Sequence, residues 1–302
     1  MRARAAFTLF QLMVVLTLLG LLFAMLLPLI AKARAEALRA RKLNNLKQLA
    51  IAVHNYHDVN GAFPPGNDKN DFSAAARLLP YVEEENVYKQ LQFEKPITDK
   101  VNQDVAARSI KVFLSPQDPL ESVKKDLGAT NYLFNAGSKP ALKDNDGAFW
   151  QDSKLRITEI TDGTSNTIMI GETLKGDGME KAVDVRRQHV ALKAEALKNL
   201  NDDSGVQDWK DNKNIAGDRC ASWIDGRFLQ GTFTGTRLLN DPRPDVNCAG
   251  QGGLSALRSL DDMVAIAMCD ASTRFVNAKK IKLDTWKALL TRGGGEVVPF
   301  DF

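Results

Sequence analysis

The sequence of 302 residues has little cysteine and little histidine, with three of each. Three cysteines are too few for a disulfide scaffold that would hold a chain of this length together. Three histidines leave few candidate general bases, and no G-x-S-x-G segment is present, so serine-hydrolase chemistry has no support. The sequence therefore predicts no catalytic residues, no enzyme activity and no cofactor.

Excess charge of one sign is also absent. The formal net charge is only +3, and no basic stripe with interleaved aromatic residues occurs, which argues against nucleic acid as a partner. A hydrophobic content of 44% with 25% charged residues is typical of a chain that folds.

One segment lacks formal charge altogether. Residues 7–30, from Phe7 to Ile30, form an uncharged apolar run of 24 residues. At about 1.5 Å per residue a helix of this length spans a hydrocarbon core of roughly 30 Å. A secretory signal peptide is the alternative, with Ala31-Lys32-Ala33 as its cleavage site, but its apolar core would be about 7–15 residues long. The length favours a membrane-spanning helix.

The helix pattern continues through residues 31–60, which are rich in Ala, Leu, Lys and Arg. Apolar residues recur every three to four positions and form an amphipathic stripe; the stripe comprises Leu43, Leu46, Leu49 or Ala50, Val53 and Tyr56 or His57. Asn60-Gly61 predicts the end of the helix. Pro28 should kink the apolar part. We therefore expect one long helix with an apolar half (7–30) and an amphipathic half (31–60).

The N-terminus resembles that of type IV prepilins and pseudopilins. Six residues with two arginines precede Phe-Thr-Leu-x-x-Leu and the apolar run. The resemblance implies a leader over residues 1–6, cleavage by prepilin peptidase between Ala6 and Phe7, and N-methylation of Phe7. It also implies assembly with other pilin-like subunits. The residue before the cut is usually Gly but is Ala6 here, and the usual Glu is replaced by Gln11.

The charge distribution around the span conflicts with this resemblance. Arg2 and Arg4 precede the span, whereas Lys32, Arg34, Arg39, Arg41 and Lys42 follow it. Counting positive charges alone would place the residues after the span in the cytoplasm. The resemblance instead implies an anchor in the inner-membrane lipid and a domain in the periplasm or on a pseudopilus. The basic run also has two interpretations, contact with anionic lipid headgroups or a solvated helix face.

Residues 61–302 have the pattern of an α+β domain. Residues 78–91 predict a short helical segment, and residues 110–114, 167–171 and 263–268 predict strands. Residues 177–214 form the most probable insertion, with a helical pattern over 182–200. We expect a mainly antiparallel sheet packed on the amphipathic half of the long helix.

Several segments of this part resemble one large bacterial family, which joins a prepilin-type N-terminus to a domain of unknown function, DUF1559. They are LNNLKQLAIAVHNYHDVNGAFPPG, LLPYVEEENVYKQL, FLSPQDP, ITDGTSNTIMIGE and TWKALLTRGGGEVV. Two family motifs are altered here. The histidine of the family's H-x9-DG motif falls on Leu260, with Asp270-Ala271 in place of DG, and Ser115-Pro116-Gln117-Asp118 stands where Cys-Pro-Ser-Asp is usual.

Two segments could hold a cation. Asp162, Ser165 and Asn166 offer oxygen ligands of the kind that Ca²⁺ prefers, but Asp-Gly-Thr-Ser-Asn is also typical of a turn. His54 and His57 have metal-ligand spacing on a helix, but no further His or Cys lies nearby, and packing against the domain explains them equally well. We therefore predict no metal and keep Asp162, Ser165 and Asn166 as weak candidates.

Cys220 and Cys248 lie in polar, turn-rich sequence, which is typical of a disulfide that joins two loops. Cys269 ends an apolar run, where a small hydrophobic side chain fits. We expect a Cys220–Cys248 disulfide and a buried free thiol at Cys269.

Taken together, the sequence predicts a pseudopilin-like anchored subunit of a secretion or surface-assembly system. The alternative is a non-assembling, single-pass anchored domain that binds a ligand or cation.

Overall fold

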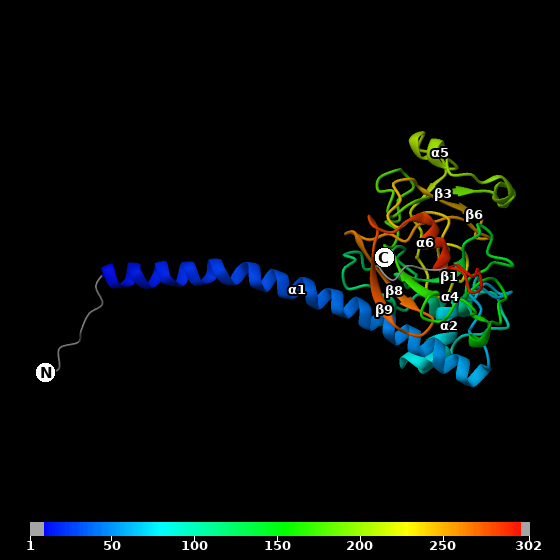
Figure 1. Ribbon diagram of the computed structural model, residues 1–302, viewed down its shortest axis with the longest axis horizontal. Coiled ribbons are helices and arrows are strands. Elements are labelled where there is room, and N and C mark those ends of the chain that lie inside the picture. Colours follow the sequence, from blue (N-terminus) through cyan, green and yellow to red (C-terminus); the bar gives the residue numbers. More distant parts are fainter. Residues whose placement is uncertain (1–8, 297–302) are drawn as a thin grey trace. The chain divides into compact units, whose positions relative to one another are not determined.

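The computed structural model describes residues 9–296. The chain divides after Arg41 into two compact units. Helix α1 (Leu9–Asn60) begins in the first unit and ends in the second (Figure 1).

Helix α1 has 52 residues and contains Pro28. Its apolar half is exposed wherever the structure describes the side chains, as Leu9 (80%), Met25 (75%) and Leu29 (63%) illustrate. By length and composition α1 can cross a membrane. The helix ends where the sequence predicted, since Gly61 adopts a φ of +74° and its N–H donates to the His57 carbonyl at 2.7 Å, as at many helix C-termini.

The second unit contains a five-stranded sheet in the order β5-β1-β2-β8-β9. Only the β1–β5 pair is parallel. The strands are β1 (Tyr132–Gly137), β2 (Ile168–Glu172), β5 (Thr232–Thr234), β8 (Met263–Met268) and β9 (Thr273–Asn277). The expected α+β fold with a mainly antiparallel sheet is therefore confirmed.

A smaller sheet with the order β4-β3-β6-β7 lies beside the first. Its strands are β3 (His189–Leu192), β4 (Ile215–Ala216), β6 (Asp245–Cys248) and β7 (Gly253–Leu254). The β3–β6 pair is parallel, and the other two pairs are antiparallel.

Short helices connect these strands. They are α2 (Ala74–Leu78), α3 (Glu85–Tyr88), α4 (Lys100–Ala106), α5 (Val206–Lys210) and α6 (Leu283–Ala288). Short 3₁₀ helices occur at Leu79–Val82, Lys111–Phe113, Ile157–Glu159 and Ala194–Asn199. Side chains cap two of the helices, because Ser73 and Asp99 accept hydrogen bonds from the backbone of α2 and α4.

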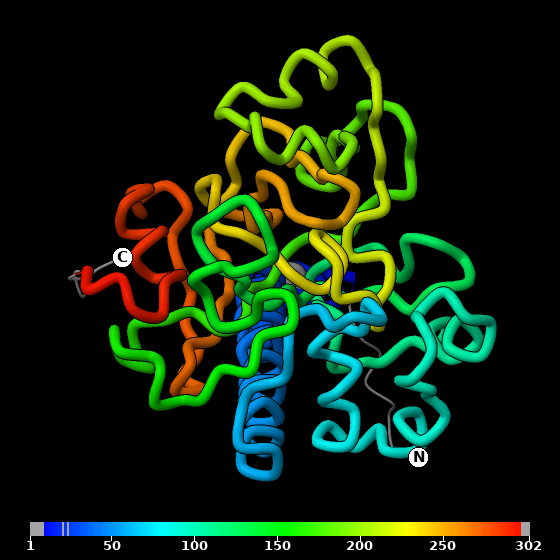
Figure 2. The backbone as a smooth tube through the Cα atoms, turned by 90° about the vertical axis from the view of Figure 1, so that its right-hand side faces the viewer, coloured from blue at the N-terminus to red at the C-terminus, as the bar shows by residue number. Residues whose placement is uncertain are grey.

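The main sheet separates two hydrophobic cores, because successive residues of a strand point to opposite faces. Tyr132 and Phe134 of β1 pack in the core that contains the amphipathic half of α1. Leu133, between them, packs in the core that contains Trp286 of α6. Strands β8 and β9, drawn in orange, lie beside the light-blue end of α1 (Figure 2). The predicted stripe is confirmed, with Leu46, Leu49, Ala50 and Val53 fully buried.

Two predicted elements are wrong. Residues 110–114 form a 3₁₀ turn instead of a strand, because buried Ile110 and Phe113 are spaced by one turn and the Leu114 N–H bonds to the Lys111 carbonyl. The helix expected over 182–200 is replaced by β3 and a 3₁₀ turn. There, pairing with β6 along four residues overrides the helix propensity of the local sequence.

Candidate functional site

The predicted leader residues Ala6 and Phe7 lie outside the described residues. Gln11, Pro28 and Ile30 lie in α1, and their side chains are exposed. The predicted assembly positions are therefore on the surface of the apolar half.

The Asp162–Asn166 segment forms turns in the structure. The Asp162 carboxylate accepts hydrogen bonds from the backbone N–H groups of Gly294 (2.6 Å) and Gly295 (2.8 Å), and the Asn166 side chain donates to the Asp162 carbonyl. Asp162 thus fastens the glycine-rich segment near the C-terminus. Within residues 9–296 no group of three or more His, Cys, Asp or Glu side chains could hold a metal.

The histidine pair lies at the end of α1 and packs against the domain. The rings of His54 and His57 contact Phe63 edge to face, at centroid distances of 6.0 and 5.4 Å. His57 Nε2 accepts a hydrogen bond from the Ile157 N–H at 3.3 Å. The packing interpretation of the two histidines is therefore correct.

The predicted Cys220–Cys248 disulfide is wrong, because both residues are buried free thiols. Cys220 packs in the hydrophobic core under the main sheet, whereas Cys248 packs with Val246 of the small sheet. Polar sequence neighbours made these two core positions look like loop positions. Cys269 is a buried free thiol, as expected, and burial raises its pKa.

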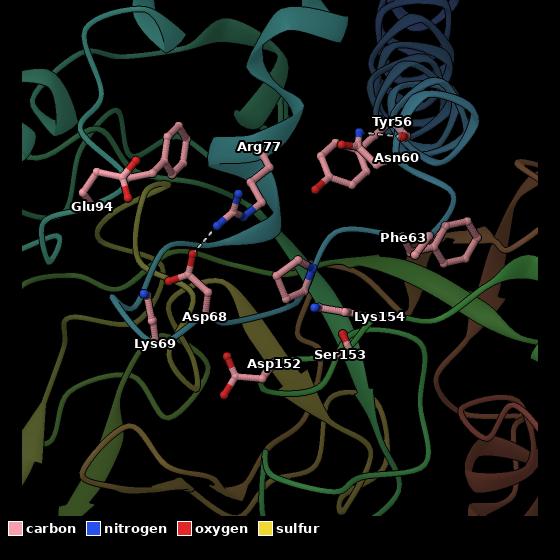
Figure 3. Close-up of a pocket in the computed structure, with 13 residues that line it drawn as sticks. Tyr56, Asn60, Phe63, Asp68, Lys69, Arg77, Glu94, Asp152, Ser153 and Lys154 are labelled. Atoms are coloured by element: carbon pink, nitrogen blue, oxygen red, sulfur yellow. Dashed lines mark hydrogen bonds and ion pairs between the residues drawn. The ribbon is translucent and has the colours of Figure 1, made fainter.

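A cleft of about 880 Å³ lies at the end of α1 (Figure 3). Loops and the helices α1 and α2 supply its walls. The lining residues are Tyr56, Asn60, Ala62, Phe63, Pro65, Asp68, Lys69, Arg77, Phe93, Glu94, Asp152, Ser153 and Lys154. This volume lies within the range of pockets that hold small ligands.

An ion pair between Arg77 and Asp68 forms the inner wall of the cleft. Asp68 also accepts hydrogen bonds from the N–H groups of Asn70 (2.9 Å) and Phe72 (3.0 Å). The Arg77 guanidinium lies 4.9 Å from the centroid of the Phe93 ring. Asp68 therefore holds Arg77 in one position, with one ring face of Phe93 covered.

Two polar groups at the cleft are buried and lack a hydrogen-bond partner within the described residues. Ser153 is 2% exposed, and within the described residues its Oγ and the Nε of Arg77 make no hydrogen bond. Burial raises the pKa of Tyr56, so its hydroxyl remains a donor. Buried polar groups of this kind are usually satisfied by protein, water or ligand.

A second feature is a buried polar cluster where α1 meets strand β2. Lys42 and Glu172 are almost fully buried and form an ion pair at 2.8 Å. Lys42 also donates to Gln117 Oε1 at 2.8 Å, and the Ser115 hydroxyl donates to Glu172. Burial raises the pKa of Glu172. This cluster attaches the amphipathic half of α1 to the sheet.

The altered family motifs meet at this cluster. Ser115, Gln117 and Leu260 line a cavity of about 10 Å³ together with Lys42 and Glu172, which is room for about one water molecule. The residues that replace the family's cysteine and histidine are therefore neighbours in space, although more than a hundred positions separate them in sequence.

The other altered motif position, Ala271, has a φ of +62°. This left-handed conformation suits the glycine of the family's DG pair and disfavours a residue with a Cβ atom. We predict that Ala271→Gly raises the free energy of unfolding by about 1 kcal/mol. Chemical denaturation measures the change. Ala265→Gly in β8, where the backbone is extended, is the control and should destabilise the protein. Equal effects at both positions would contradict the prediction.

Two further buried charge clusters hold the small sheet. Asp118 pairs with Arg187 (2.9 Å) and Lys175 (3.6 Å). Burial acts to raise the pKa of Asp118, but the hydrogen bond from Arg187 and the charge of Lys175 outweigh it, and the pKa is lowered. Asp245 pairs with Arg219 (2.9 Å) and Arg258 (2.5 Å), and all three side chains are fully buried.

These observations define an α+β protein with one helix long and apolar enough to cross a membrane. A family model described as protein of unknown function (DUF1559) matches residues 31–279. The chain therefore belongs to this family, and the DUF1559 resemblance is confirmed. The match begins after the apolar run. No curated protein and no solved structure matches the chain.

Sequence reasoning missed the cleft and the three charge clusters. Their members come from distant segments, as with Asp68, Phe93 and Lys154 in the cleft. One signal was a charged residue directly after an apolar run, as Glu172 follows residues 167–171.

Proposed function

We propose that the protein is a pseudopilin-like, membrane-anchored subunit of a secretion or surface-assembly system. The apolar half of α1 lies in the inner membrane, and the domain lies in the periplasm or on a pseudopilus. Prepilin peptidase processes the leader, and the protein acts through contacts with other pilin-like subunits and without catalysis.

The observation that carries this proposal is the contrast within α1. The described side chains of its apolar half are exposed, whereas Leu46, Leu49 and Val53 further along the same helix are fully buried. Exposed apolar residues along residues 9–30 have no role in a soluble domain, and lipid or neighbouring apolar helices are the environments that suit them.

The first test is the mature N-terminus. We expect mass spectrometry of the membrane-extracted protein to find a chain that starts at Phe7, because a short basic leader adjoins an apolar run that is too long for an ordinary signal. Ala6→Glu, which places a charge at the cut, should block processing. A chain that retains Met1, or one cut after Ala33, would contradict the proposal.

The second test addresses assembly. We expect Gln11→Glu to increase self-association in the membrane, because a carboxylate there can pair with a neighbour's terminal amine where an unpaired charge is costly. Crosslinking in the same membranes measures the oligomers. The isosteric control is Gln11→Met, which adds no charge and should leave the ladder unchanged. Identical ladders for all three chains would remove position 11 from the mechanism of assembly.

The cleft favours a second role for the domain, namely ligand binding. It is large enough for a small molecule, and it contains buried polar groups without a hydrogen-bond partner among the described residues. An anchored domain that binds a ligand requires no polymer. Crosslinking of the unaltered chain therefore separates the two roles, since only the first predicts oligomers.

A further inference from the structure

We infer that the cleft at the end of α1 binds a short neutral saccharide. This inference depends only on the second unit of the chain. It holds whether or not the protein is processed at Ala6 or assembles through its apolar half.

The charges of the cleft give no net preference for an anion or a cation. Its lining carries three basic and three acidic side chains, so neither an anion nor a cation gains from the summed field. Asp68 already neutralises Arg77. The remaining four, Lys69, Lys154, Glu94 and Asp152, form no ion pair within the described residues and are exposed. A neutral ligand leaves this balance undisturbed.

The hydrogen-bonding groups fit a ligand rich in hydroxyls. Tyr56 and Lys154 supply donors, and Asp152 supplies acceptor oxygens. These residues are arranged around one space (Figure 3). A hydroxyl both donates and accepts, so adjacent sugar hydroxyls can satisfy both kinds of group. Hydrogen bonds to ionised side chains are stronger than those between neutral groups.

The same lining does not suit a peptide. Peptides commonly add a strand to an exposed sheet edge or place a helix in an apolar groove. Loops 62–69 and 152–154 and helices α1 and α2 form the walls, and no named strand of the described chain lines the cleft. Arg77 covers one face of Phe93, and Phe63 is 1% exposed, so the cleft offers no open apolar groove.

Calorimetric titration of the full chain in a detergent without sugar groups tests the inference. The probes are triacetylchitotriose, cellotriose and maltotriose as neutral trisaccharides. Trigalacturonate is the anionic comparator, and the peptide Lys-Ala-Glu, which has two positive and two negative groups, is the zwitterionic one. We expect at least one neutral trisaccharide to bind with a Kd of about 1 mM or tighter, and the charged probes to bind more weakly.

Two variants assign the binding to the cleft without disturbing the fold. Tyr56→Phe removes one hydroxyl but keeps the ring that packs on Tyr81, and it should weaken binding by about three- to tenfold. Lys154→Ala removes an exposed ammonium and should weaken binding by about tenfold. Lys125→Ala, an exposed lysine outside the cleft, is the matched control. No binding of any neutral trisaccharide, tighter binding of a charged probe, or equal affinity of all variants would overturn the inference.

Discussion

Lys42→Met should lower the free energy of unfolding by about 3–5 kcal/mol, because it leaves the buried Glu172 carboxylate without its cation. Lys42 and Glu172 lie 2.8 Å apart, and both are nearly inaccessible to solvent. The loss should become smaller in acid. A carboxyl whose folded-state pKa is raised, as for Glu172, binds a proton on folding, and its contribution is lost as pH rises through that pKa.

Urea denaturation near pH 5 and pH 8 measures the change for Lys42→Met. Lys47→Met is the matched control on the same helix. Lys47 is exposed and donates to the Ala271 carbonyl at 2.8 Å, so its loss should stay below about 1.5 kcal/mol. The double variant Lys42→Met with Glu172→Met removes both charges and should recover most of the stability. If the double variant is no more stable than Lys42→Met, the loss of stability comes from the changed side-chain volume and not from the unpaired charge of Glu172.

Asp245→Asn is expected to destabilise the protein by a similar amount, about 3–5 kcal/mol, because two arginines lose their shared counterion. The Asp245 carboxylate contacts Arg219 at 2.9 Å and Arg258 at 2.5 Å, with every side chain fully buried. It also accepts a hydrogen bond from the Ala256 N–H at 3.1 Å. Asparagine keeps the shape but supplies no charge.

The control for this cluster is Asp202→Asn. Asp202 pairs with Arg243 at 3.7 Å, but its side chain is 81% exposed, so the loss should stay below about 1 kcal/mol. Thermal or urea unfolding of the two variants in parallel measures both losses of stability, and it shows how much more a buried ion pair contributes than an exposed one. Equal losses at 245 and 202 would mean that burial of the arginine cluster contributes little.

Local sequence was sufficient for the elements that have a clear period. The stripe from Leu46 to Val53 predicted the buried face of α1, and the apolar runs of β2 and β8 predicted two central strands. The strand predicted for residues 110–114 was wrong because, over so short a span, a strand and a single helical turn bury similar apolar residues. Residues 182–200 contain good helix formers, so local sequence predicted a helix there. Strand β3 forms instead because it pairs with β6.

The polar architecture was not predictable in the same way. Lys42 and Glu172 are 130 positions apart, and nothing in the neighbourhood of either residue indicates the other. Cys220 and Cys248 looked like loop residues because polar neighbours surround them, yet the fold places both in hydrophobic cores. A single sequence reports local preference, whereas ion pairs and clefts depend on which distant segments meet.

The hydrogen bond from Lys47 to the Ala271 carbonyl joins residues that are 224 positions apart, and this separation has a consequence for the order of folding. The amphipathic half of α1 is made early, but the strands that cover its stripe, β8 and β9, are made near the end of synthesis. Contacts between such distant segments form slowly because a long loop must close first. Until then Leu46, Leu49 and Val53 have no sheet to cover them, and the nascent chain must be protected from aggregation over most of its length.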